Sequence, residues 1–372
     1  MGRQDTDRVT ADRLTDAERA AVRRSVELAE LGASTALPNP VVGCVLLTPA
    51  GESVGEGFHQ RPGGPHAEVM ALAAAGERAC GAIAVVSLEP CNHVGRTGPC
   101  VEALISSGGA RVIVGVRDPW PAAAGGIERL RSAGVEVIDL ADLHDPAATA
   151  AVAAAEDVNR VWLTATRRGR PFVTWKAGMS IDGRVAAPDG TSRWITSTES
   201  RADVHRLRAR VDTMMVGVGT VLADDPQLTV RDANGTLTGP QPLRVVIDSH
   251  GRTPSNARVL DRAAATWVAT VAELGAAADG RVDLAAVLGR LFRLGRRHVL
   301  LEGGPRLAAA FFDAGLVDEA IAYIAPTLLG AGASALSGGS VTTLAGRHKA
   351  ELRDVTRIGS DVRLRYAMLA RG

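Results

Sequence analysis

Apolar and polar positions along the chain alternate between the pattern of buried strands and the pattern of amphipathic helices. A helix is expected from Thr15 to about Gly32, because Thr15 and Glu18 match a capping box and a glycine can end a helix. Short apolar runs then predict strands at residues 41–47, up to 58, 83–88, 112–116 and 135–138. Helices are predicted at residues 65–75, 100–107 and 127–132. This alternation predicts an α/β layered domain with a largely parallel sheet.

A long alanine-rich helix, and the break that follows it, divide the chain. The helix is expected to begin at Asp145-Pro146 and to run to about Thr166, where the sequence RRGRP of residues 167–171 interrupts it. We therefore expect one domain at residues 1–165 and another at residues 166–372. In the second half, strands are predicted at residues 172–177, 213–218, 243–248, 266–270, 298–302 and 319–325. Helices are predicted after a cap formed by Thr196 and Glu199, and at residues 305–314, so this half is also α/β.

Composition limits the class of protein. A chain of 372 residues, 46% apolar and 22% charged, can form about two globular domains with sizeable cores. A net charge of +1 and only 3% aromatic residues argue against nucleic acid as the main partner. No apolar run approaches the roughly 18 residues of a membrane span, and the charged N-terminal segment lacks the apolar core of a secretory signal. We expect a cytoplasmic protein with no membrane or nucleic-acid partner.

The four cysteines fall into two kinds. In a cytoplasmic chain an even number of cysteines does not imply disulfides. Cys44 and Cys80 lie in or just before apolar strands, as inert core cysteines do. Cys91 and Cys100 each follow a proline at a loop-to-helix junction. Together with His66 they would supply three of the four ligands that Zn²⁺ prefers and leave one position for water.

The fourth position separates two interpretations of such a site. His59 or His93 could complete a closed structural zinc site. Glu68 favours a catalytic site, because two residues along a helix correspond to a turn of about 200°, so His66 and Glu68 are poorly placed to bind one ion. A carboxylate beside the ion can exchange protons with a zinc-bound water. The His-x-Glu element followed by two proline–cysteine pairs matches the zinc deaminases, in which the glutamate is the acid and base.

The second half contains weaker signals. It has no Gly-x-Gly-x-x-Gly sequence after a strand, so an ordinary Rossmann dinucleotide site is not supported. Residues 302–305 (EGGP) lie between a predicted strand and a helix, where glycines let a phosphate approach the helix N-terminus. Such a segment is more often only a turn. Arg208 and Arg231 could bind phosphate, but an isolated arginine is usually a solvated surface residue.

Three motifs of the first half resemble a known family: residues 38–44 (PNPVVGC), 66–69 (HAEV) and 88–100 (LEPCNHVGRTGPC). They are similar to the bifunctional riboflavin-biosynthesis deaminase/reductase family (RibD type). Eight residues separate Cys91 from Cys100, whereas the gap in cytidine and tRNA-adenosine deaminases is usually two. The long loop, with Asn92, His93 and Arg96, is specific to this group.

Five motifs of the second half resemble the reductase part of the same family: residues 171–176 (PFVTWK), 180–184 (SIDGR), 192–196 (SRWIT), 219–226 (GTVLADDP) and 302–305 (EGGP). The resemblance covers about residues 20–365. It implies an α/β protein with an N-terminal cytidine-deaminase-like three-layer domain and a C-terminal dihydrofolate-reductase-like domain. The second domain would use NADPH without the Rossmann fingerprint.

The resemblance also implies roles for individual residues. In the first domain Glu68 would be catalytic, His66, Cys91 and Cys100 would bind Zn²⁺, and Asn39 would help to hold the pyrimidine. The NADPH site would consist of Gly178, Trp194, Thr220, Asp224, Ser249, Gly304, Pro305, Arg306 and Leu307. The substrate site of the reductase would consist of Ser192, Arg208, Leu228, Arg231 and Glu302. Lys176 and Asp224 would lie near the path of the hydride, without an assigned role in proton transfer.

The reaction implied by the resemblance has two parts. The first domain would hydrolytically deaminate 2,5-diamino-6-(5-phosphoribosylamino)pyrimidin-4-one, and the second would reduce the ribosyl group of the product to ribityl with NADPH. We expect a small-molecule pyrimidine ribose phosphate as substrate and a homo-oligomeric chain. The segment Trp120–Gly126 departs from the family pattern and lacks its basic residue, which affects the substrate loop rather than the zinc chemistry. Two alternatives stay open: a deaminase acting on nucleic acid, and a non-enzymatic module with a closed structural zinc.

Overall fold

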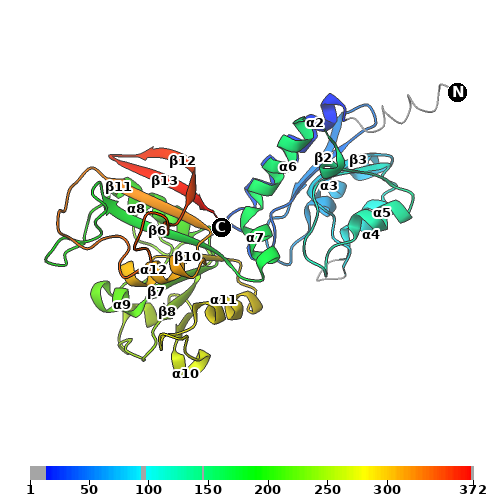
Figure 1. Ribbon diagram of the computed structural model, residues 1–372. Helices are drawn as coiled ribbons and strands as arrows, with labels where there is room; N and C mark the ends of the chain where they lie inside the picture. Colours follow the sequence, from blue (N-terminus) through cyan, green and yellow to red (C-terminus); the bar gives the residue numbers. More distant parts are fainter. Residues whose placement is uncertain (1–13, 94–97, 145, 370–372) are drawn as a thin grey trace. The chain divides into compact units, whose positions relative to one another are not determined.

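The computed structural model describes residues 14–93, 98–144 and 146–369 (Figure 1). The chain divides into two compact units, Met1–Arg167 and Arg168–Gly372. The division falls at the end of helix α7 (Arg160–Arg168). Residues 94–97, which include Arg96 of the predicted loop, and Asp145, the predicted helix cap, lie outside the described residues.

The first unit is built on a five-stranded sheet. Its strands, in spatial order, are β2 (Ser53–Phe58), β1 (Gly43–Leu47), β3 (Ile83–Leu88), β4 (Arg111–Val116) and β5 (Glu136–Asp139). β3, β4 and β5 run parallel, whereas β1 pairs antiparallel with both β2 and β3. The prediction of a largely parallel sheet is therefore wrong for the part formed by β2, β1 and β3. A hairpin joins β1 to β2, and β1 also runs opposite to β3.

Helices cover both faces of this sheet and give three layers. They are α2 (Asp16–Leu31), α3 (Ala67–Ala75), α4 (Cys100–Ser106), α5 (Gly126–Ser132), α6 (Pro146–Val158) and α7. Alternate residues of β1 point to opposite faces: Cys44 and Leu46 pack with α3, α4 and α5, and Val45 and Leu47 pack with α2. The predicted capping box of α2 is confirmed, since Thr15 Oγ1 accepts a hydrogen bond from the Glu18 amide at 3.2 Å.

Two predicted helices of this unit differ from the structure. The short helix begins at Ala67 with His66 as its N-cap, rather than at Pro65. The long alanine-rich helix is two helices, α6 and α7, separated at Asn159. The side chain of Asn159 is buried and bonds the backbone of Val41, accepting from its N–H at 2.9 Å and donating to its carbonyl at 2.7 Å. A contact across 118 residues of sequence thus coincides with a break that local helix propensity does not predict.

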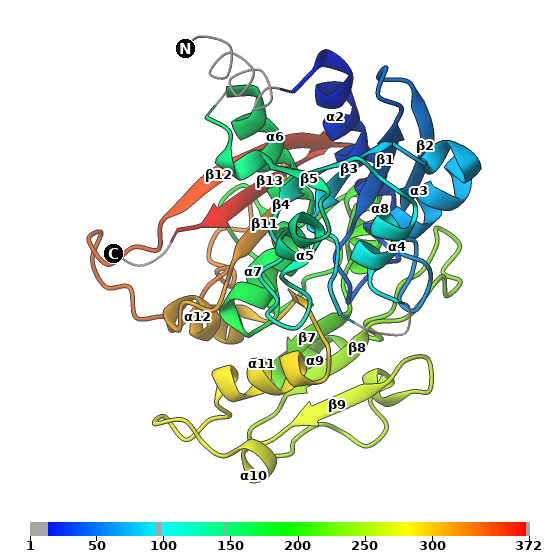
Figure 2. The ribbon, with the colours of Figure 1, turned by 90° about the vertical axis from the view of Figure 1, so that its right-hand side faces the viewer.

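The second unit contains an eight-stranded sheet. In spatial order its strands are β12 (Ala350–Ile358), β13 (Asp361–Met368), β11 (Glu319–Ala325), β6 (Phe172–Ser180), β10 (His298–Leu301), β7 (Thr213–Gly217), β8 (Leu243–Ile247) and β9 (Thr266–Ala269). The run from β11 to β9 is parallel, and the β12–β13 hairpin, red in Figure 2, joins it antiparallel. The sequence analysis did not predict this hairpin.

Five helices accompany this sheet: α8 (Thr198–Arg208), α9 (Val218–Asp224), α10 (Val271–Leu274), α11 (Leu284–Arg293) and α12 (Pro305–Asp313). α11 and α12 pack on one face of the sheet, and α9 packs on the other. The cap of α8 is Ser197, whose side chain accepts from the amide of Ser200, and not the predicted Thr196. The carboxyl ends of β6, β7 and β10 lead into the motifs at residues 180–184, 219–226 and 302–305, as is usual for ligand sites in parallel sheets.

Candidate functional sites in the two units

Three predicted ligands converge in the first unit. His66 lies at the N-cap of α3, Cys91 follows β3, and Cys100 is the first residue of α4. Their ligand atoms lie within 4.8 Å of one another. His66 Nδ1 is 3.1 Å from Cys100 Sγ and 3.5 Å from Cys91 Sγ. The structure therefore brings together three residues that are up to 34 positions apart in sequence.

The three groups of this cluster shift one another's pKa values. A hydrogen bond from the Cys100 thiol, and then one from His66, lower the pKa of Cys91 to about 4 although burial opposes this. The same contact with Cys91, together with burial, raises the pKa of Cys100. The hydrogen bond with Cys91 also raises the pKa of His66. A thiolate, a second sulfur and an imidazole converging on one point form the donor set that Zn²⁺ prefers, so these residues fit the ion.

Glu68 lies beside this cluster without being part of it. It is the second residue of α3, and only 3% of it is exposed. Burial raises the pKa of Glu68 to about 7. The group of possible metal ligands among the described residues holds His66, Cys91 and Cys100, but not Glu68. A buried carboxyl next to a metal position is the arrangement that proton transfer to and from a bound water requires.

The candidates for a fourth ligand are placed elsewhere. Both ring nitrogens of His59 are engaged: Nε2 lies 3.0 Å from Asn39 Nδ2 and Nδ1 lies 3.1 Å from the carbonyl oxygen of Pro65. His93 is likewise outside the metal-binding group of the described residues. The closed structural site therefore finds no fourth side chain in the described part of the chain. The contact between Asn39 and the pyrimidine stays a prediction.

Glu89, which the sequence analysis did not single out, holds the loops near Cys91 in place. Glu89 is buried, and its carboxylate accepts from the amides of Asp118 at 2.9 Å and Ile127 at 3.1 Å. The backbone N–H of Asn92 donates to the carbonyl of Ala123 at 3.0 Å, and Ala123 belongs to the atypical Trp120–Gly126 segment. This segment thus packs against the loop that carries Cys91. The available signal was a glutamate directly after the apolar run of residues 83–88 and before a Pro-Cys pair, since an acid in such a place is rarely buried unless it is paired.

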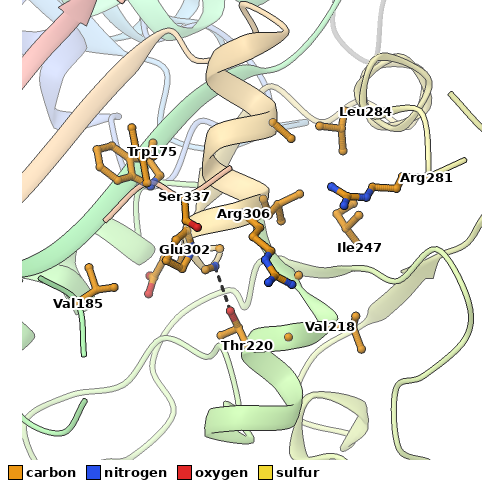
Figure 3. A pocket seen from close by; sticks show the side chains of 18 of the residues that line it. Trp175, Val185, Val218, Thr220, Ile247, Arg281, Leu284, Glu302, Arg306 and Ser337 are labelled. Carbon is orange, nitrogen blue, oxygen red and sulfur yellow. Dashed lines mark hydrogen bonds between the residues drawn. The ribbon is translucent and has the colours of Figure 1, made fainter. Parts of the chain in front are cut away.

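The predicted nucleotide residues line one cavity of the second unit, of about 1190 Å³. They are Gly178, Thr220, Asp224, Ser249, Gly304, Pro305, Arg306 and Leu307. The Gly304 amide donates to Thr220 Oγ1 at 3.1 Å and so ties the N-terminus of α12 to α9, as Figure 3 shows. A Cβ at Gly303 would meet Leu307 Cδ2 at 3.0 Å, so this turn has little room for a side chain. The ninth predicted residue, Trp194, lines a neighbouring cavity instead.

That second cavity, of about 600 Å³, is lined by all the predicted substrate residues of the reductase: Ser192, Arg208, Leu228, Arg231 and Glu302. Leu228 is buried with φ of 50°, a conformation that is uncommon for a branched side chain. Some residues line both cavities, among them Lys176, Thr220, Asp224 and Glu302. The two cavities therefore adjoin at these side chains, where a bound nucleotide and a second ligand could meet.

Paired charges dominate this junction. Arg208 binds both carboxylate oxygens of Glu302, at 2.8 and 2.9 Å, and Lys176 Nζ is 3.8 Å from the same carboxylate. Burial alone would raise the pKa of Glu302, but Arg208 and Lys176 outweigh it and lower the pKa to about 2. Burial lowers the pKa of Lys176. Arg231 donates to Thr229 Oγ1 at 2.9 Å and to the Gly235 carbonyl at 2.8 Å. Neither arginine is thus an isolated surface residue.

Comparison with known proteins gives consistent matches in both units. Residues 15–116 match the family described as the cytidine and deoxycytidylate deaminase zinc-binding region, and residues 171–364 match the RibD C-terminal domain. Riboflavin biosynthesis protein RibD of Escherichia coli is 41% identical over 362 residues, which cover 91% of this chain and 96% of that protein. Its Mycobacterium tuberculosis counterpart is 43% identical over 330 residues, which cover 89% and 91%.

Solved structures give the same result. RibD of Acinetobacter baumannii has a TM-score of 0.83 and 37% identity, and the match covers 95% of this chain and 99% of that chain. A Thermotoga maritima protein, described as a diaminohydroxyphosphoribosylaminopyrimidine deaminase/5-amino-6-(5-phosphoribosylamino)uracil reductase, has a TM-score of 0.82 and 31% identity over the same shares. Within the described residues, no helix is both long and apolar enough to cross a membrane.

Proposed function

Because this chain belongs to the RibD family of riboflavin-biosynthesis enzymes, we propose that its two units each carry one of the two reactions. The chain is bifunctional: it is a diaminohydroxyphosphoribosylaminopyrimidine deaminase and a 5-amino-6-(5-phosphoribosylamino)uracil reductase. Residues 1–165 would form the deaminase domain and residues 166–372 the reductase domain. The convergence of His66, Cys91 and Cys100 within 4.8 Å, beside the buried Glu68, carries the assignment of the first reaction.

In the deaminase, His66, Cys91 and Cys100 would hold Zn²⁺. When bound, the ion lowers the pKa of a water toward about 7 and so supplies a nucleophile at neutral pH. The Glu68 carboxylate would take one proton from the attacking water and pass it to the pyrimidine ring nitrogen. It would then take the remaining proton, on the hydroxyl added to the ring carbon, and pass it to the departing amine, so that a C–N bond is replaced by a C–O bond and ammonia leaves. The walls around Glu68 exclude bulk water, because α3 packs against β1 and β2.

The test of this assignment is the variant Glu68→Gln. It retains the volume of the side chain but cannot exchange the proton, so we expect ammonia release to be lost while zinc stays near one per chain. Glu77→Gln, at an exposed position after the same helix, is the matched control and should behave as wild type. Normal deamination by Glu68→Gln would eliminate the role assigned to this carboxyl.

In the reductase, the larger cavity would bind NADPH. The Gly303-Gly304 turn at the N-terminus of α12, which also bonds Thr220, suits the diphosphate of a dinucleotide. Arg306 and Arg281, labelled in Figure 3, and Arg252 line the same cavity. These three arginines favour a nucleotide with an additional phosphate over one without it. Bound NADPH supplies a hydride. Saturation with NADPH and not with NADH, and a raised KM for NADPH in Thr220→Val, are the expected results.

The smaller cavity would hold the pyrimidine ribose phosphate. The ribosylamine would open to an imine, and addition of a hydride to the sugar carbon and of a proton to the imine nitrogen would give the ribityl chain. Glu302 orients Arg208 through two hydrogen bonds, and Lys176 lies where both cavities adjoin. In an assay on the deaminated intermediate, we expect Arg208→Ala or Arg231→Ala mainly to raise KM. Unchanged kinetics in both variants would remove these residues from the binding site.

The other functions that the sequence left open are less well supported. A deaminase acting on nucleic acid would have to explain a reductase-family match over residues 171–364. A closed structural zinc lacks a fourth ligand among the described residues. The homo-oligomeric state stays a prediction, which light scattering of the purified chain tests.

A further inference from the structure

One face of α8 forms part of the wall of the smaller reductase cavity. Arg201, Val204, His205 and Arg208 all line this cavity. Their spacing along the helix places them on one side, since residues three and four positions apart are neighbours on a helix. Arg206, between His205 and Arg208 in sequence, does not line the cavity. The helix thus presents an imidazole one turn before the arginine that binds Glu302.

The imidazole of His205 has an unused hydrogen-bonding group. The residue is half-buried, and Nδ1 is enclosed with no hydrogen-bond partner within the described part of the chain. Buried polar atoms in folded proteins are almost always paired, so an unpaired nitrogen on a residue that lines a cavity is available to a ligand once the ring turns toward it. Burial, and then the charge of Arg208, lower the pKa of His205, so the ring is neutral at pH 7 and carries one N–H donor.

The charges that face His205 indicate the kind of ligand. Arg208, Arg231 and Lys176 act on the ring as cations, and Glu302 acts as the anion. This excess of positive charge attracts an anionic group, and phosphate is the anionic part of the substrate. The cations are already engaged, because Arg208 is bidentate to Glu302 and Arg231 is bound to Thr229 and Gly235. His205 would add to these cations a donor that no described protein group uses.

We propose that His205 is a further substrate-binding residue of the reductase, and that its imidazole donates a hydrogen bond to the phosphate of the pyrimidine ribose phosphate. This inference rests on the proposed reductase function. His205 touches no group that reacts, so its contribution is to binding. Substitution should consequently raise KM and leave kcat unchanged.

The experiment compares two substrates in the full chain with NADPH. One is the phosphorylated ribosylaminouracil, and the other is the same compound without its phosphate. A hydrogen bond to a charged group is worth about 1.5–3 kcal/mol, so His205→Ala should raise KM for the phosphorylated substrate about 10- to 100-fold. KM for the dephosphorylated substrate and for NADPH should not change. His205→Gln, which keeps an N–H donor, should recover part of the loss.

Arg206→Ala is the matched control, because its largely exposed side chain lies on the same helix and outside the cavity. An unchanged KM for NADPH in His205→Ala shows that the reductase site is folded. An equal loss with both substrates would indicate a structural role and overturn the proposal, as would an unchanged KM for the phosphorylated substrate. If the wild-type chain reduces neither substrate with NADPH, the proposed reductase function fails. If the wild type prefers the phosphorylated substrate and His205→Ala keeps that preference, only the role of His205 fails.

Discussion

The pair formed by Glu302 and Arg208 offers a quantitative test of the electrostatics of the reductase site. The side chains are 11% and 18% exposed, and Lys176, also 18% exposed, lies 3.8 Å from the same carboxylate. The variant Glu302→Gln keeps the shape of the side chain and removes its charge. It therefore leaves two nearly buried cations without their counter-ion.

Two independent considerations give the size of the effect. A pKa of Glu302 that falls from 4.5 to about 2 corresponds to about 3 kcal/mol of favourable interaction with the charged form. Removing one partner of a buried ion pair typically costs about 3–5 kcal/mol. We therefore expect Glu302→Gln to lower the free energy of unfolding of the second unit by about 3 kcal/mol at pH 7.

The effect also depends on pH in a defined direction. Since the folded pKa of Glu302 lies below the unfolded value, its contribution is fully present above pH 5 or so and is lost as the pH falls toward 2. The difference between wild type and Glu302→Gln should narrow from about 3 kcal/mol above pH 5 to about 1 kcal/mol near pH 3. Hydrogen–deuterium exchange of peptides from β6 and β10, measured across a urea series, reports on this unit alone.

Glu273→Gln provides the control. Glu273 forms an ion pair with Arg290, but each side chain is 36% exposed, so removing its charge should cost no more than about 1 kcal/mol. If Glu302→Gln destabilises the unit no more than this surface variant, or if the difference from wild type does not narrow at low pH, the carboxylate is not held by the two cations and the reasoning is refuted.

Three further predictions concern the first unit. Removing zinc with a chelator should abolish ammonia release and leave NADPH-dependent reduction of separately supplied intermediate intact; loss of both activities in parallel assays would contradict the division between units. Asn159→Ala should lower the free energy of unfolding by about 2–4 kcal/mol, because it strands the buried N–H and carbonyl of Val41, and urea denaturation followed by circular dichroism measures this. Gly43→Ala should destabilise the unit by about 3 kcal/mol or more in the same assay, since its Cβ would lie 2.0 Å from the carbonyl oxygen of Ser25. A variant as stable as wild type would show that α2 and β1 can move apart with little loss of stability.

Local signals in the sequence predict many of the helices and strands of this protein and the ligands of its metal site. The capping box of Thr15 and Glu18 marks the start of α2, and the apolar run at residues 83–88 coincides with β3. Both signals depend on side chains a few residues apart, which interact in much the same way wherever the segment lies. The cysteine and histidine motifs carry a comparable local signal, because the chemistry of zinc restricts which residue types can serve as ligands. The resemblance of residues 20–365 to one family added the residues expected to bind NADPH and the substrate.

Only the tertiary structure decided how separated residues pair. The break at Asn159 accompanies hydrogen bonds to Val41, and the charge state of Glu302 depends on Arg208, which lies 94 positions away. The unpaired nitrogen of His205 likewise becomes visible only when the cavity is formed. The energies of burial, ion pairing and hydrogen bonding depend on what surrounds a group in space, and a linear pattern does not contain that information. The sequence by itself therefore determined which segments fold locally and which chemistry the chain can carry, and the folded structure determined which side chains meet to perform it.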